Sequence, residues 1–162
     1  MTIWADGDSL QRELRDLLCR RAGRGRGARL RAVFVSARRL ALPAVEGVEA
    51  IVVESGPEAA DDRIVEDASV GDLAVTRDLP LAQRLAEKGL VVLNDRGEVF
   101  TAENVRERRS LRDRAAELRA AGLAPESERR RSWGARELKK FADALDRELA
   151  RAAKRTDDAG HS

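Results

Sequence analysis

The chain has 162 residues, of which 43% are hydrophobic but only 3% aromatic, so its core must be aliphatic. Cys19 is the single cysteine, which excludes an intrachain disulfide and a cysteine-based zinc site. The single histidine, His161, lies in a polar tail, which disfavours histidine-dependent catalysis. The sequence contains no signal pattern and no apolar run near the ~18 residues of a membrane helix, so we expect a soluble, cytoplasmic protein without a membrane partner.

The net charge of +2 hides an uneven distribution along the chain. Residues 11–40 hold ten arginines and two acids, residues 41–100 hold five bases and thirteen acids, and residues 101–162 are again basic. An acidic centre between basic flanks is typical of a metal site that serves a polyanionic substrate. The alternative, that these charges only cover solvated helix faces, stays open.

Apolar runs and helical periodicity alternate along residues 1–154, which we interpret as a single domain. Strands are predicted at 2–6, 30–36, 48–54, 73–77, 90–94 and 98–101. Helices are predicted at about 8–22, 57–69, from Pro80 to Gly89, 101–121 and 135–154. Residues 122–134 are predicted to form a polar linker, and residues 155–162 a disordered tail. Short apolar strands alternating with helices indicate an α/β fold, with a mostly parallel central sheet and helices on both faces, a three-layer sandwich.

Two of the predicted strands end in an aspartate, Asp6 in the first and Asp78 just after the fourth. Ligands of an open parallel sheet bind outside the carboxyl ends of its strands. If the two strands are neighbours, both acids lie at one edge together with Asp8. Asp8 and Asp78 also stand where helix N-caps are expected, which is the alternative role for each. Asp6 heads no helix, so capping does not explain it.

Asp61 occupies the first position of an apolar helix face. That face, in the helix 57–69, continues with Ile64, Val65 and Ala68. Burying an ionised carboxylate without a partner costs several kcal/mol, so Asp61 needs a cation or dense hydrogen bonding. Its neighbour Asp62 is predicted to be solvated, and Glu58 fits the last position of a capping box.

Four carboxylates can therefore converge without any histidine, namely Asp6, Asp8, Asp61 and Asp78. Like charges at such a site raise one another's pKa unless a divalent cation neutralises them. Carboxylates favour hard cations, and we predict Mg²⁺ or Mn²⁺ as the cofactor. Asp72, at the start of a strand, should lie at the opposite edge as a turn residue.

Three stretches of the sequence resemble a known bacterial family. TIWADGD, GPEAADDRIVEDASVGDLAVTRDLPLAQRLAEKGLVVLNDRGEVFT and ENVRERRSLRDRAAELRAAG are similar, in order and spacing, to the YaiI/YqxD family, and the similarity covers nearly all of residues 2–150. That family is grouped with the PIN-like domains, which are Mg²⁺- or Mn²⁺-dependent nucleases with a Rossmann-like parallel sheet. The resemblance thus implies a PIN-like fold and nuclease activity.

The resemblance also implies roles for single residues. Asp6 and Asp8 match the acidic pair of the first strand, Asp61 the helix acid, and Asp78 the acid of a T-x-D motif with Thr76 beside it. Asp62 and Glu58 would be supporting acids. Two segments depart from the family: its D-A-D-A-C-P run is D-G-D-S-L-Q here, and its G-G-P segment is G-L-A-P at residues 122–125.

These observations predict a nuclease that hydrolyses phosphodiester bonds, of RNA more than DNA, by metal-activated water. Phosphate contacts are predicted for the arginines of the basic flanks, Arg20, Arg21, Arg24, Arg26, Arg129, Arg130 and Arg131. One alternative is a non-catalytic RNA-binding or regulatory module with a structural metal ion. Another is a haloacid-dehalogenase-like phosphatase, whose D-x-D-x-[TV] motif is approximated at residues 6–10, although Leu10 replaces the Thr or Val.

Overall fold

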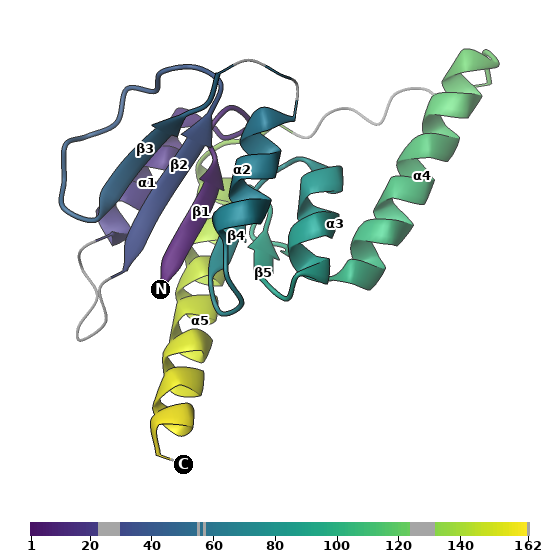
Figure 1. Cartoon of the computed structure of the whole chain (residues 1–162). Helices are drawn as coiled ribbons and strands as arrows, with labels where there is room; N and C mark the ends of the chain where they lie inside the picture. Colours follow the sequence, from purple (N-terminus) through teal and green to yellow (C-terminus); the bar gives the residue numbers. More distant parts are fainter. Residues whose placement is uncertain (23–29, 55, 57, 124–131, 162) are drawn as a thin grey trace.

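The computed structural model describes residues 1–22, 30–54, 56, 58–123 and 132–161. In this part of the chain, six strands form one sheet between two layers of helices (Figure 1). The strand order is β3-β2-β1-β4-β5-β6, and all neighbouring pairs are parallel except β5 and β6. The strands are β1 (Thr2–Asp6), β2 (Arg31–Ser36), β3 (Val48–Val52), β4 (Leu73–Val75), β5 (Val91–Leu93) and β6 (Val99–Phe100). The mostly parallel α/β sandwich predicted from the sequence is confirmed.

The first strand lies in the middle of the sheet, between β2 and β4. All five residues of β1 are buried, because Ile3 and Ala5 face one helical layer and Trp4 faces the other. Its register places Ala5 opposite Val75, the last residue of β4. Asp6 therefore ends the central strand beside the first residue that follows β4, which is Thr76.

Helices cover both faces of the sheet. They are α1 (Arg12–Arg21), α2 (Ala59–Asp67), α3 (Leu79–Glu87), α4 (Ala102–Ala120) and α5 (Ala135–Gly160). On one face α1 and α5 enclose an apolar core that includes Phe34 and Phe141, and on the other the core includes Ile64 of α2 and Leu81 of α3. Because α1, α2 and α3 each follow a parallel strand, their first turns lie at the carboxyl edge of the sheet. None of the described helices combines the length and the apolarity needed to cross a bilayer.

Most helix boundaries lie within two residues of the sequence prediction, and larger differences concern the start of α1, the cap of α2 and the end of α5. Helix α1 starts at Arg12 and not at residue 8, because the chain turns after β1, where the Ser9 amide donates to the Asp6 carbonyl at 3.2 Å. Helix α2 has Glu58 as its N-cap without a side-chain hydrogen bond, so the predicted capping box is wrong. Helix α5 continues to Gly160, which corrects the prediction of a disordered tail from residue 155. No glycine or proline interrupts it earlier, and the Thr156 hydroxyl donates to the Ala152 carbonyl. Most of the predicted linker at 122–134 lies outside the described residues.

Candidate metal centre at the carboxyl edge of the sheet

Asp6 is fixed at the end of the central strand by a short hydrogen-bond chain. The Thr76 hydroxyl donates to Asp6 Oδ2 at 2.9 Å, and the Asp78 amide donates to the Thr76 oxygen at 3.0 Å. Asp6 is 6% exposed and Thr76 is 1% exposed. Burial raises the pKa of Asp6, the hydrogen bonds from Thr76 and Ser9 lower it in part, and the charges of Asp78 and Asp8 raise it further. Asp6 is thus an oriented carboxylate in a negative environment.

Asp61 lies over the same edge, in the first turn of α2. It is half-buried on the helix face that holds Ile64 and Ala68, as the apolar pattern predicted. Burial raises its pKa to about 6, and the charges of Asp78 and Asp6 contribute to the shift. The structure therefore brings Asp6, Asp61 and Asp78 close enough for their charges to repel one another.

Asp78 is the N-cap of α3, as one of its two interpretations held. Its Oδ1 accepts the Leu81 amide at 3.0 Å. Within the described part of the chain, no hydrogen bond reaches its second carboxylate oxygen. Asp78 can therefore cap the helix and still offer one oxygen to a ligand at the edge.

The Asp8 carboxylate is bound by the loop that follows β2. The chain turns after Asp6, and the Asp8 carboxylate accepts the Ala37 amide at 2.7 Å and pairs with Arg38 at 3.4 Å. It does not cap α1 either, because the N-cap of that helix is Gln11. Asp8 ties the turn after β1 to the loop after β2, and its charge still contributes to the raised pKa of Asp6.

The acids share an edge without forming a closed coordination shell. In the residues that the structure describes, no three Asp, Glu, His or Cys side chains converge closely enough to hold a metal ion. The donor chemistry nevertheless fits a hard divalent cation, since the carboxylates repel one another and Asp78 has a free oxygen.

Two polar residues at the same edge, Asn94 and Asp95, were not predicted as part of the site. Both follow β5 directly and are 7% exposed. Asp95 Oδ2 accepts a hydrogen bond from Gln11 at 2.7 Å and pairs with Arg77 at 3.4 Å. Like Asp6, these residues lie at the carboxyl end of a strand, which is the signal that could have found them. The glycine that follows, Gly97, favoured the interpretation of this segment as a simple turn. Because Asp95 already has a cationic partner, it organises the edge and is not a free ligand.

The remaining predicted acids lie in different places. Asp62 is exposed, as predicted, and pairs with Arg84 at 2.8 Å. Glu58 is exposed too, but its charge contributes to the raised pKa of Asp61. Asp72 lies at the opposite edge, where it accepts the Thr2 amide and the Trp4 indole N–H, each at 3.0 Å. Its assignment as a turn residue away from the site is confirmed.

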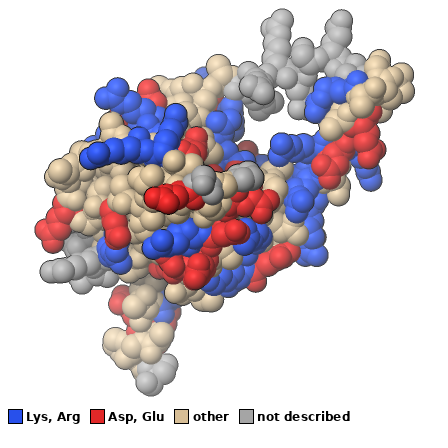
Figure 2. All heavy atoms as spheres, turned by 45° about the horizontal axis from the view of Figure 1, so that its top comes forward, with Lys and Arg blue, Asp and Glu red and all other residues tan. Residues whose placement is uncertain are grey.

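The predicted basic flank is not where we expected it. Arg20 and Arg21 lie in the last turn of α1, which runs back from the carboxyl edge, and Arg21 pairs with Asp146 of α5 at 2.9 Å. They therefore do not flank the acids. The other arginines of that prediction fall outside the described residues: Arg24, Arg26, Arg129, Arg130 and Arg131. Figure 2, which turns the carboxyl edge toward the viewer, shows acidic and basic side chains interspersed on this face.

Comparison with known proteins identifies the family. A family model described as "Uncharacterized BCR, YaiI/YqxD family" matches residues 4–151, from the central strand into α5. The chain belongs to the YaiI/YqxD family. All four predicted acids lie within the matched segment.

Relatives with similar lengths carry the name UPF0178 protein. The protein from Myxococcus xanthus (strain DK1622) is 43% identical over 157 residues, which cover 95% of this chain and 97% of the relative. The protein from Treponema denticola (strain ATCC 35405) is 41% identical over 154 residues and 95% of both chains. The protein from Treponema pallidum (strain Nichols) is 44% identical, over 93% of this chain and 82% of the relative. No solved structure matches the chain.

Proposed function

We propose that this YaiI/YqxD-family protein is a PIN-like, divalent-metal-dependent nuclease that hydrolyses phosphodiester bonds, of RNA more than DNA. The observation that carries the proposal is the environment of Asp6. This carboxylate is buried at the end of the central strand, oriented by Thr76, and repelled by nearby acids. Acids that lie together at the carboxyl edge of a parallel sheet and repel one another favour the binding of Mg²⁺ or Mn²⁺.

Each residue at the carboxyl edge would have a separate role in this site. Asp6 and Asp78 would hold the cation, Asp61 would complete the group from α2, and Asp8 would take part from the turn after β1. Thr76 orients Asp6 by donating to its Oδ2. A divalent cation bound there would lower the pKa of a water molecule and stabilise charge on the phosphate. Asp62 and Glu58 would add negative potential without direct contact.

A cleavage assay with matched variants tests the proposal. Purified protein is incubated with labelled single-stranded RNA and DNA in Mg²⁺, in Mn²⁺ and in a chelator. We expect metal-dependent cleavage by the wild type, none by Asp6→Asn, and unchanged cleavage by Asp113→Asn, which alters an exposed acid on α4. Cleavage that survives Asp6→Asn would show that a contaminant or another site is responsible.

A non-catalytic RNA-binding module is the second candidate. The observation that favours it is that no three acids converge in the described residues. In that case the protein would bind RNA and gain stability from Mn²⁺, but would not cleave in any of the assays. The phosphatase alternative is separated by fluoroberyllate, which would occupy Asp6 as a mimic of an aspartyl-phosphate.

A further inference from the structure

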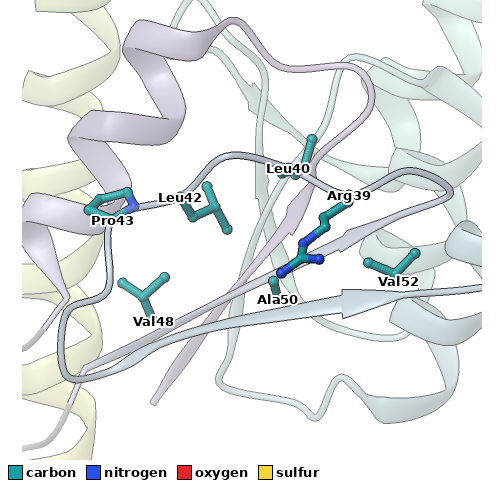
Figure 3. A pocket seen from close by; sticks show the side chains of 7 residues that line it. All are labelled: Arg39, Leu40, Leu42, Pro43, Val48, Ala50 and Val52. Carbon is teal, nitrogen blue, oxygen red and sulfur yellow. The ribbon is translucent and has the colours of Figure 1, made fainter.

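A pocket of about 630 Å³ lies between the edge strand β3 and the loop 37–47 (Figure 3). Its walls are formed by six apolar residues and one arginine, Arg39. On the strand, Val48, Ala50 and Val52 line it together, because alternate residues of a strand point to the same face. The volume lies in the range of roughly 300–1,000 Å³ that is usual for small-molecule sites.

The pocket adjoins the acidic edge through the loop that forms its wall. Leu40 packs so closely on Gly7 that a Cβ atom added there would lie 2.5 Å from the Leu40 Cδ1. Gly7 separates Asp6 from Asp8, and the Ala37 amide at the start of the same loop holds Asp8. A molecule in the pocket would therefore lie across Leu40 from the turn that joins Asp6 to Asp8.

Arg39 is the charged group of the pocket. In contrast to Arg38, which pairs with Asp8, and Arg31, which pairs with Glu49, no carboxylate pairs with Arg39 among the described residues. Figure 3 shows its guanidinium reaching from the loop toward Ala50 on β3. An arginine above aliphatic walls is suited to a ligand that combines an apolar body with an anion.

The free edge of β3 adds hydrogen-bonding groups. Gly47 accepts the Ala32 amide, and the Val53 amide donates to the Ser36 carbonyl, so the odd-numbered residues between them bond to β2. By the alternation of a β-ladder, the N–H and C=O groups of Ala50 and Val52 face away from β2. No strand of the described residues pairs with this edge, so these groups are available to the polar rim of a flat ligand.

We propose that this pocket binds a nucleotide of the substrate, with its base between the aliphatic walls and its phosphate on Arg39. The inference rests on the proposed function, because the neighbouring acidic edge would act on the phosphodiester beside that nucleotide. A nucleobase has weakly polar faces and hydrogen-bonding edges, which matches aliphatic walls next to open backbone groups. Aliphatic walls would serve here in place of aromatic stacking, in a chain with only 3% aromatic residues.

Binding of free nucleotides in a chelator, where no cleavage occurs, tests the pocket by itself. The probes are adenosine and uridine 5′-monophosphate, with ribose 5-phosphate and decanoate for comparison, followed by backbone amide NMR. We expect the amides of Leu40, Ala50 and Val52 to shift with both nucleotides, and affinity for ribose 5-phosphate to be at least about tenfold weaker, since the base would contribute apolar contacts.

Variants locate the site. Arg39→Glu, an exposed change that leaves the core intact, should weaken nucleotide binding by about tenfold or more through charge reversal. Ala50→Trp should abolish it by filling the pocket. The matched controls are Arg155→Glu on α5 and Val70→Trp, an exposed valine at the opposite edge, and neither should change the affinity.

Several results would overturn the inference. If ribose 5-phosphate binds as tightly as the nucleotides, the pocket recognises only the phosphate. If decanoate binds more tightly than the nucleotides, the pocket is a site for amphiphilic acids. Nucleotide affinity that is unchanged in Arg39→Glu would also exclude it. Asp6→Asn separates this proposal from the nuclease proposal, because it should keep nucleotide binding while losing cleavage. If the wild-type protein binds nucleotides in the pocket but cleaves no RNA or DNA, the nuclease proposal fails and nucleotide binding by the pocket remains supported.

Discussion

Asp61 is an ionisable residue of α2, and it lies on the same helix face as the buried residues Ile64 and Ala68. Its pKa is about 6 in the folded protein, against an ordinary value of 3.8. The Asp61 carboxyl therefore binds a proton more readily in the folded than in the unfolded state, and its contribution to the stability of the metal-free protein should fall as the pH rises from about 4 to 6. The difference corresponds to roughly 1–2 kcal/mol after allowance for solvent screening of a half-buried group.

Asp61→Asn should remove this penalty. We expect urea unfolding without metal to give a variant about 1–2 kcal/mol more stable than wild type at pH 7, and about equal to it at pH 4. Asp62→Asn is the matched control, because Asp62 is exposed and paired with Arg84. Equal pH dependence in wild type and Asp61→Asn would mean that the Asp61 carboxyl does not carry the raised pKa.

Thr76 is the second residue whose effect can be isolated. Thr76→Val keeps its shape but removes the hydroxyl that donates to Asp6 Oδ2. The pKa of Asp6 should then rise, because that hydrogen bond lowers it, and the buried carboxylate should cost about 1–3 kcal/mol of stability at pH 7. Thr76→Ser restores the donor and serves as the control in the same unfolding measurements. A Thr76→Val protein as stable as Thr76→Ser at pH 7 would show that the hydrogen bond contributes nothing.

At the scale of the elements, like charges lie near one another at three places: Asp6 at the end of β1, Asp78 after β4 and Asp61 at the start of α2. A divalent cation should link these elements and stabilise the fold by mass action. At a Mn²⁺ concentration ten times Kd, the gain is about 1.4 kcal/mol, or a rise in Tm of roughly 4 °C. Mg²⁺ should bind more weakly, as the general order of metal affinities suggests.

Melting curves with and without Mn²⁺ measure this stabilisation as a change in Tm. Asp6→Asn and Asp78→Asn should each reduce the Mn²⁺-dependent rise in Tm, whereas Asp113→Asn on α4 should keep it. Asp6→Asn should also raise the Tm of the metal-free protein, since it removes a repelled carboxylate. If all of these variants gain as much from Mn²⁺ as wild type does, the edge acids are not its ligands.

Elements that depend on local pattern were predictable from the sequence, and long-range contacts were not. The apolar runs of β1 and β4, with Asp6 at the end of the first and Asp78 after the second, were enough to predict this edge. The position of Asp8 could not be read in the same way, because it depends on the Ala37 amide of a distant loop. The missed role of Asp95 likewise depends on Arg77, which follows a different strand.

At the scale of the whole molecule, the two edges of the sheet have different charge environments. Arg38 and Arg77 lie at the carboxyl edge beside the acids, in exposed ion pairs with Asp8 and Asp95. Arg20 lies exposed at the far end of α1. The basic and acidic segments that are separate in the sequence are thus mixed in space, and among the described residues Arg38 and Arg77, which follow β2 and β4, lie beside the acids.

RNA binding should therefore depend on Arg38 and Arg77 and not on Arg20. Each phosphate contact with a single strand contributes about −0.7 to the slope of log affinity against log salt. Arg38→Ala and Arg77→Ala should each weaken binding to all sequences alike and make the slope shallower by about 0.7, and Arg20→Ala should change neither. Exposed ion pairs are worth less than about 1 kcal/mol, so these variants should remain folded. Titrations of labelled single-stranded RNA at several salt concentrations measure the slopes. A loss of slope in Arg20→Ala, with none in the other two, would place the RNA at the opposite edge, away from the acids.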